Sequence, residues 1–292
     1  MKLRTLVLVL ATAGFCLGFG AATREPSLRE AARASGMMIG AAVRPAQLSE
    51  AAYASTLARE FNMVEPEDAL KWEVVHPEPQ RFDFSQTDQV VDFARQHDMK
   101  VRGHTLVWHR QNPPWLTEGK YTSAELAKLL ENHIKIVVGH YRGRIFAWDV
   151  VNEAFDELHP GELRDTLWRE GLASSDELKA TNNGARSQPY SYIERCFRWA
   201  HEADPQALLF YNEAEAEPIN LKSDAIYAMV RDFRQRGVPI DGVGFQMHIA
   251  NLRADIESIS ANIRRFTALG VQVHITEMDV ALPVDSSGNA RP

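Results

Sequence analysis

Seven short apolar segments that alternate with amphipathic helical segments constrain the fold of this chain more than any other feature. They cover residues 37–43, 61–64, 100–109, 145–152, 207–212, 243–248 and 271–277. Each has the length and composition of a buried strand, and helical periodicity lies between them. Strands alternating with helices predict parallel βαβ units. Seven such strands in one domain favour an α/β fold of the eight-stranded (β/α)8 TIM barrel type over an open sheet.

Two of the intervening segments show the helical pattern most clearly. Thr122 and Glu125 form a capping box, which predicts the start of a helix. The apolar residues that follow at helical spacing are Leu126, Leu129, Leu130, Ile134, Val137 and Val138. A later helix is expected to end at Gly270. Its apolar face consists of Ile256, Ile259, Ile263, Phe266 and Leu269.

Residues 1–22 have the pattern of a secretory signal peptide. Two basic residues precede an apolar run that ends near Gly20, where small residues follow. The run is short and polar chain comes after it, which favours a cleaved signal over a membrane span. Phe15 before Cys16 fits a lipoprotein cleavage site poorly. We therefore expect a freely secreted product, extracellular or periplasmic.

Composition and charge narrow the classes of partner. The chain has 292 residues, 45% hydrophobic and 24% charged, which is ordinary for a soluble globular protein. Removing residues 1–22 takes away Lys2 and Arg4 and no acid, so the formal charge moves from −7 to −9. This balance argues against nucleic acid and membranes as partners. Residues 23–292 would form one catalytic barrel, expected as a monomer. Cys196 would be its one cysteine, a core thiol without a disulfide partner.

The strand at residues 145–152 ends in an amide, Asn152, followed by a carboxylate, Glu153. Carboxyl ends of parallel strands are where α/β enzymes hold their reactive groups. Taken alone, these two residues could equally begin a loop or cap a helix. A second apolar strand also ends in a glutamate, Glu277, and this favours a catalytic role for the two glutamates over a loop or helix cap. A retaining glycosidase needs an acid/base carboxyl group of raised pKa and a nucleophilic carboxylate ~5 Å from it.

Five short motifs between about Met37 and Val280 can be compared with the motifs of known enzyme families. They are 149–154 (DVVNEA), 275–279 (ITEMD), 102–109 (RGHTLVWH) with Gln111 and Pro114-Trp115, 82–84 (FDF) and 242–248 (GVGFQMH). Together they resemble the motifs of glycoside hydrolase family 10, the endo-β-1,4-xylanases. The resemblance implies a (β/α)8 barrel that hydrolyses β-1,4-xylosidic bonds in xylan or xylo-oligosaccharides by double displacement. It implies a hydrolase without a cofactor.

The resemblance also assigns the chemical roles. It implies that Glu153 is the acid/base and Glu277 the nucleophile. Asn152 would hydrogen-bond the 2-hydroxyl of the sugar under attack, a contact that strengthens in the transition state. His248 would lie between Glu277 and Asp279 and hold the nucleophile ionised and oriented.

Further residues would bind the sugars. The resemblance places His104 and Lys71 on the non-reducing side, with Trp108 as an apolar wall, and Gln246 and Tyr211 along the cleft. Three of these residues have a simpler interpretation. His104 and Trp108 could be core residues, and Lys71 a solvated lysine.

Two aromatic residues and one histidine pair also leave alternatives open. Trp115 could stack on a sugar face or pack inward, and Trp148 could be plain core. His104 and His109 are five residues apart, which puts them on opposite faces of a strand. With no cysteine or carboxylate cluster beside them, a metal site is not expected.

This chain departs from the family pattern in three places. Glu67-Asp68 stands where the family has Glu-Asn ahead of Lys71, so an acceptor-only carboxylate replaces an amide that can donate. We expect altered binding of the distal sugar there. Asn212-Glu213-Ala214-Glu215 replaces Asn-Asp-Tyr-Asn, which removes a tyrosine from the leaving-group side. An extra polar loop is expected at residues 174–188, near the same side.

Twelve residues follow Val280, too few for a helix, an eighth strand and a closing helix. Either the chain stops short of the full gene product or the barrel stays open. We expect a barrel without its eighth βα unit, with two unpaired edges. On this basis the 292-residue chain would be unstable or weakly active, and a full-length parent active.

Two alternative functions accompany the xylanase hypothesis. A non-catalytic xylan-binding protein would keep the cleft without turnover, but Glu153 and Glu277 are both present. A barrel glycosidase that cleaves another β-1,4-glucan is the second. The motif at residues 102–109 favours xylan over that substrate.

Overall fold

The computed structural model describes residues 25–172, 190–250, 254–284 and 287. The expected signal peptide and the expected loop at 174–188 lie outside these residues. Within the part of the chain that is described, no helix is long and apolar enough to cross a membrane.

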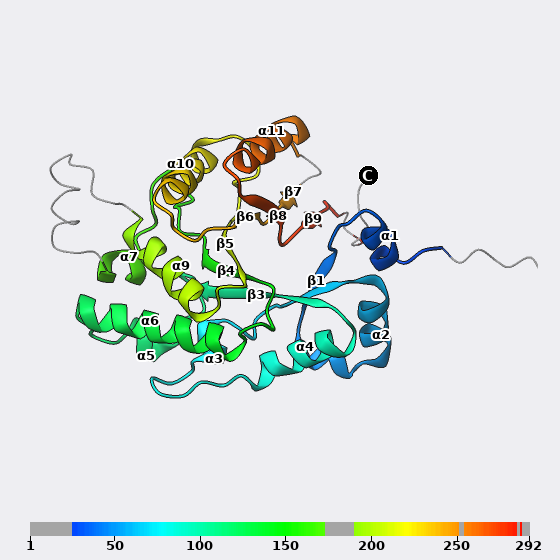
Figure 1. Cartoon of the computed structure of the whole chain (residues 1–292), viewed down its shortest axis with the longest axis horizontal. Helices are drawn as coiled ribbons and strands as arrows, with labels where there is room; N and C mark the ends of the chain where they lie inside the picture. Colours follow the sequence, from blue (N-terminus) through cyan, green and yellow to red (C-terminus); the bar gives the residue numbers. More distant parts are fainter. Residues whose placement is uncertain (1–24, 173–189, 251–253, 285–286, 288–292) are drawn as a thin grey trace, which may run out of the picture.

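Seven parallel strands form one curved sheet, which confirms the predicted strands and their order (Figure 1). They pair in chain order, each strand with the next. The strands are β1 Gly40–Val43, β2 Met63–Pro66, β3 Lys100–Val107, β4 Ala147–Asn152, β5 Leu208–Glu213, β6 Gly242–Phe245 and β8 Gln272–Ile275. A separate pair joins β7 His248–Ala250 to β9 Asp279–Ala281. The predicted strand at 243–248 is therefore two short strands.

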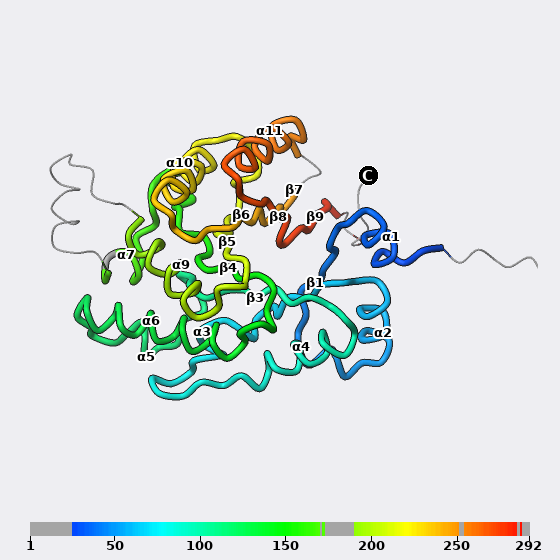
Figure 2. Tube along the Cα trace, in the orientation of Figure 1, coloured from blue at the N-terminus to red at the C-terminus, as the bar shows by residue number. Residues whose placement is uncertain are grey.

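Helices surround the strands, the longer ones in chain order from α2 through α4, α6, α9 and α10 to α11 (Figure 2). They are α1 Leu28–Ala34, α2 Ala51–Glu60, α3 Trp72–Val75, α4 Ser85–Gln96, α5 Pro114–Thr117, α6 Ser123–His140, α7 Leu167–Leu172, α9 Ser191–Ala203, α10 Leu221–Gln235 and α11 Ile256–Thr267, with a 3-10 helix η1 at Pro45–Ser49. This is the architecture of a (β/α) barrel. Among the described residues, β1 and β8 are the two edges of the sheet and do not pair with each other.

The predicted helix signals are mostly confirmed. Thr122 and Glu125 form both hydrogen bonds of the capping box at the start of α6. Gly270, which follows α11, has a φ of +77°, a left-handed conformation that glycine adopts without strain. Ile256 was wrongly placed on the buried face of α11. It is the first residue of that helix and is 65% exposed.

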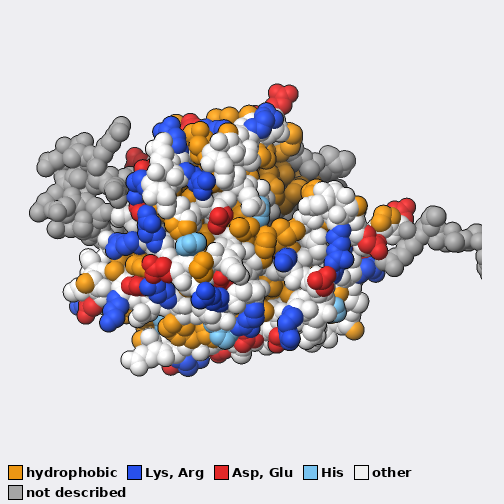
Figure 3. Space-filling model, in the orientation of Figure 1, with side chains coloured by type: hydrophobic (Ala, Val, Ile, Leu, Met, Phe, Trp, Pro, Cys, Tyr) orange, Lys and Arg blue, Asp and Glu red, His pale blue; other side chains and the backbone are white. Residues whose placement is uncertain are grey.

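The core fills the space between strands and helices. Cys196 is fully buried on α9, as predicted. Trp148 is also fully buried, which supports its interpretation as core. Its ring lies against Gly103 of β3, where a Cβ atom would come within 2.3 Å of a ring carbon. Any side chain at residue 103 would displace this tryptophan and, with it, the strand that leads to Glu153. On the surface face shown in Figure 3, basic and acidic side chains are interspersed.

Candidate active site

The site lies where the parallel strands end. Glu153 directly follows β4, Asn212 lies near the end of β5, and Gln246 follows β6. Glu277 comes two residues after β8, and its backbone N–H donates to the Gln246 carbonyl at 3.1 Å. Strands far apart in the chain thus deliver their polar side chains to one end of the barrel.

Glu153 is held by three hydrogen-bond donors. Gln246 Nε2 donates to Oε1 at 2.9 Å and Asn152 Nδ2 to the same oxygen at 3.2 Å. Trp108 Nε1 donates to Oε2 at 2.8 Å, so this residue is more than the expected apolar wall. Burial raises the pKa of Glu153, but the hydrogen bonds from Gln246 and Trp108 outweigh it and lower the pKa overall. The raised pKa expected of a general acid is therefore not found for Glu153.

Glu277 lies between an amide and two histidines. Asn212 Nδ2 donates to Oε1 at 2.6 Å. His248 Nε2 is 3.6 Å from Oε2, and its Nδ1 is 3.0 Å from Asp279 Oδ2. His248 thus occupies the place between Glu277 and Asp279 that the resemblance implied. His104 Nδ1 lies 3.9 Å from Oε1 on the other side.

Two amide relays join the carboxylates. Asn212 Nδ2 donates both to Glu277 and to Asn152 Oδ1, at 2.8 Å, while Asn152 donates to Glu153. Gln246 donates to Glu153, and its Oε1 lies 3.1 Å from His248 Nε2. Asn212 was not predicted as a site residue. Its place at the end of β5 was the available signal.

A buried ion cluster supports the floor of the site. Arg102 Nε donates to Asp149 Oδ2 at 3.1 Å, and a second guanidinium nitrogen binds Oδ1. His104 Nδ1 is 3.0 Å from the same Oδ2. His104 was expected to bind sugar, but it is 4% exposed and partnered by Asp149, which matches the core-histidine alternative. Burial lowers the pKa of His104, but Asp149 and Glu65 raise it overall.

Glu65, on β2, completes this cluster and makes a pH-dependent prediction. Burial raises its pKa to about 7. A folded-state pKa above the unfolded value stabilises the fold below pH 4.5, and this stabilisation is lost as pH rises through 7. Glu65→Gln removes the titration. We expect the variant to gain on the order of 3 kcal/mol relative to wild type between pH 4.5 and 8.

Urea unfolding at both pH values measures this difference. Glu118→Gln, at an exposed position, is the matched control. A constant difference between Glu65→Gln and wild type across the pH range would show that Glu65 does not titrate as described.

The residues expected to bind the distal sugar already contact other side chains of the protein. Arg44, which was not predicted, pairs with Glu67 at 2.8 Å and approaches Asp68 at 3.7 Å. Gln111 Nε2 also donates to Asp68, at 3.4 Å. Lys71 is buried rather than solvated, with Nζ 4.7 Å from the centre of the Trp108 ring. The acceptor-only carboxylate of Asp68 therefore already has donors.

Two aromatic residues that could have lined the cleft pack into the protein instead. Tyr211 was expected along the cleft, but it is fully buried, and its hydroxyl donates to Glu213 Oε2 at 2.6 Å. Trp115 packs inward against Trp72, and its Nε1 donates to the His76 carbonyl at 3.3 Å. Of the two alternatives for Trp115, the structure therefore agrees with inward packing.

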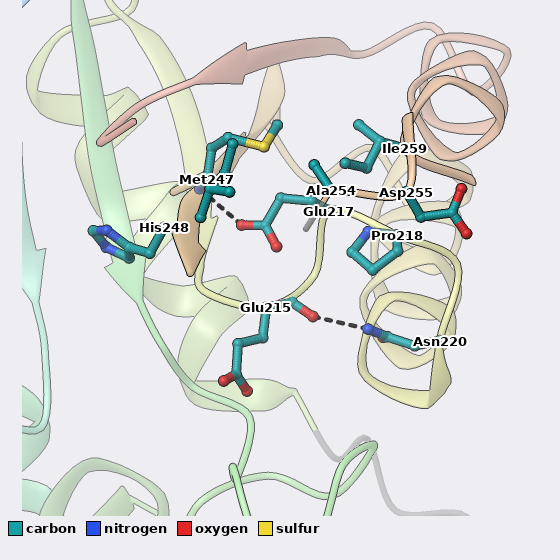
Figure 4. Close-up of a pocket in the computed structure, with 10 residues that line it drawn as sticks. Glu215, Glu217, Pro218, Asn220, Met247, His248, Ala254, Asp255 and Ile259 are labelled. Carbon is teal, nitrogen blue, oxygen red and sulfur yellow. Dashed lines mark hydrogen bonds between the residues drawn. The ribbon is translucent and has the colours of Figure 1, made fainter. Parts of the chain in front are cut away.

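A pocket of about 260 Å³ adjoins His248 (Figure 4). Its lining residues come from three segments: 215–220, 247–249 and 254–259. Glu217 accepts the Met247 N–H at 2.8 Å, which fixes one wall to the other. The small Ala214 precedes this wall where the family has tyrosine. No group of three or more potential metal ligands gathers anywhere in the described ranges.

Comparisons with known proteins agree with one family. The model of glycosyl hydrolase family 10 matches residues 27–291. Endo-1,4-beta-xylanase B of Thermotoga neapolitana is 43% identical over 80% of this chain and 63% of its own length. A beta-1,4-xylanase of Dictyoglomus thermophilum is 40% identical over 97% of this chain and 76% of its own. The chain thus spans less than two thirds of the first relative and about three quarters of the second.

A solved structure gives the same answer. Xylanase 10B from Thermotoga petrophila RKU-1, crystallised in complex with xylobiose, superposes with a TM-score of 0.81 at 40% identity. The match covers 90% of this chain and 77% of that one.

Proposed function

This chain belongs to glycosyl hydrolase family 10, and we propose that it is an endo-β-1,4-xylanase that cleaves xylan with retention of configuration. The observation that carries the proposal is the pair of glutamates, Glu153 and Glu277, joined by amide relays at the carboxyl end of one barrel. The xylobiose bound to the similar Thermotoga petrophila enzyme supports a β-1,4-xylose chain as substrate.

In the proposed mechanism Glu277 attacks the anomeric carbon while Glu153 protonates the leaving oxygen. Asn212 and His248 orient the Glu277 carboxylate, since they lie against its two oxygens. Glu153 then removes a proton from the water that hydrolyses the glycosyl-enzyme ester. Because its hydrogen bonds favour the ionised form, we expect the glycosidic oxygen to displace one donor when Glu153 acts as an acid.

The proposal is tested by release of reducing sugar from xylan and from carboxymethyl-cellulose. We expect release from xylan and little from the cellulose derivative. NMR of the first products should show the β-anomer, because two inversions restore the starting configuration. Release from the cellulose derivative alone would make the enzyme a glucanase. Binding of xylan without any release would leave a binding protein.

Glu153→Ala should separate the acid role from general damage. We expect kcat/KM to fall by about 10³-fold on xylohexaose, because protonation of an alkoxide leaving group contributes about 10²–10⁴-fold. On 2,4-dinitrophenyl β-xylobioside, kcat/KM should fall far less, because this leaving group departs without a proton. Initial rates on both substrates measure the contrast. A similar loss on both would count against Glu153 as the acid.

We also propose that residues 1–22 direct secretion, supported by the basic start and the short apolar run. N-terminal sequencing of protein recovered from the medium or periplasm tests this. A mature chain that begins near residue 23 is expected, and recovery of the chain from the cytoplasm with Met1 intact would contradict it.

A further inference from the structure

The backbone at Glu153 adopts a conformation that its side chain disfavours. Its φ is +53°, in the left-handed region. A non-glycine residue held there costs on the order of 1–3 kcal/mol and persists only where its surroundings fix it. This turn sets the direction of the proposed acid/base carboxylate. Whatever fixes the turn therefore bears on catalysis.

Three consecutive backbone N–H groups of the turn are bound by the end of β5. Glu153 N donates to the Asn212 carbonyl at 3.0 Å. Ala154 N donates to the Tyr211 hydroxyl at 3.0 Å, and Phe155 N to Glu213 Oε2 at 3.2 Å. The last two of these depend on side chains.

Glu213 organises both side-chain contacts. Its Oε2 accepts the Phe155 N–H and also the Tyr211 hydroxyl proton, at 2.6 Å. Because that proton points to Glu213, a lone pair of the Tyr211 oxygen is left for Ala154. One carboxylate oxygen thereby fixes two successive peptide groups after Glu153.

Glu213 is costly to keep in this place. It has no exposed surface, and among the described residues its Oε1 has no hydrogen-bond partner. Lys222 Nζ is 3.6 Å from that oxygen and is itself buried. A buried, incompletely satisfied carboxylate destabilises a fold unless its contacts compensate. Burial raises the pKa of Glu213 to about 7, against the opposing effects of Lys222 and Tyr211.

Resting on the function proposed above, we propose that Glu213 is a positioning residue for Glu153. Through Tyr211 and the amides of Ala154 and Phe155, it holds the left-handed turn that aims the acid/base carboxylate at the leaving oxygen. Glu213 itself is buried and contacts the turn through Tyr211 and Phe155, and no hydrogen bond joins it to the Glu153 carboxylate among the described residues.

Glu213→Gln tests this by selectivity between leaving groups. The amide keeps the size but places an N–H₂ group either against Lys222 or against the two donors, Tyr211 and Phe155. We expect kcat on xylohexaose to fall by about tenfold or more, with KM changed less than twofold. On 2,4-dinitrophenyl β-xylobioside, kcat/KM should stay within about twofold of wild type, because no proton transfer is needed in the first step.

Tyr211→Phe is the second variant, in case Glu213→Gln folds poorly. It removes the hydroxyl that joins Glu213 to Ala154, and it should show the same selective loss. Asp204→Asn is the matched control. Asp204 is a buried acid that accepts the Gly143 N–H at 2.8 Å in a loop that precedes β4, at the opposite end of the strands. The Asp204→Asn variant should unfold at a different temperature from wild type, but its relative activity on the two substrates should be unchanged.

The outcomes separate the two proposals. An active wild type whose Glu213→Gln and Tyr211→Phe variants lose activity equally on both substrates, or on neither, overturns the positioning role alone. A wild type inactive on both substrates overturns the proposed function and this inference with it.

Discussion

Glu277→Ala is expected to reduce the hydrolysis of xylan by at least about 10⁴-fold, on the order of 5 kcal/mol of transition-state stabilisation. The variant removes the carboxylate that would form the glycosyl-enzyme bond. Asn212 and His248, which lie against its two oxygens, cannot replace it, because an amide nitrogen and an imidazole already committed to Asp279 form no such ester. Reducing-sugar release from xylan measures the loss.

Azide rescue distinguishes the nucleophile from the acid/base residue by the anomer of the product. In Glu277→Ala, azide would occupy the vacated space and attack 2,4-dinitrophenyl β-xylobioside with one inversion, giving the α-azide. In Glu153→Ala, azide would attack the glycosyl-enzyme and give the β-azide after two inversions. NMR of the products distinguishes the anomers. Glu257→Gln, an exposed acid at the start of α11, is the control and should hydrolyse xylan like wild type. Substantial xylan hydrolysis by Glu277→Ala would contradict the assignment.

Asp149→Ala is expected to cost about 3–5 kcal/mol of stability, because it leaves a buried charge without its partner. Asp149 has no exposed surface and holds both Arg102, which is 2% exposed, and His104. Truncation leaves the Arg102 guanidinium, among the described acids, with Glu65 at 3.5 Å. Urea unfolding at pH 7 measures the loss, and the melting temperature should fall by on the order of 10 °C.

Two variants calibrate the effect of Asp149. Arg44→Ala breaks an exposed, solvent-screened pair with Glu67 and should cost far less stability than Asp149→Ala. Arg102→Met combined with Asp149→Leu removes both charges and should recover part of the loss, since apolar residues of similar volume can replace a buried ion pair. A loss in Asp149→Ala no larger than in Arg44→Ala would be inconsistent with an uncompensated buried arginine.

Local patterns were enough for the elements of the fold. The strand at 145–152 and the capping box of Thr122 depend on neighbours within a few residues, and such signals can be followed along the chain. The parallel order of the strands also came from the sequence, because alternation with helices permits few connections. The prediction that Ile256 is buried was wrong, because periodicity does not say which residue of a helix's first turn faces solvent.

The two glutamates were predictable for a related reason. Glu153 and Glu277 end apolar strands, and parallel strands in a barrel place their carboxyl ends together. The roles proposed for them come from the resemblance to the family motifs. The sequence by itself therefore determined the strands, the helices, the family and the pair of carboxylates.

Only the tertiary structure decided which side chains are buried and whom they contact. Tyr211 and His104 were expected to face substrate. Tyr211 is instead buried with Glu213, two residues further along β5, and burial of both is not visible in the local pattern. His104 contacts Asp149, which lies on the neighbouring strand β4 and 45 residues away in the chain. The lowered pKa of Glu153 likewise depends on Gln246 and Trp108, which arrive from two other strands. Hydrogen bonding and desolvation act over a few ångströms in space, and residues far apart in the chain come that close only when the barrel has folded.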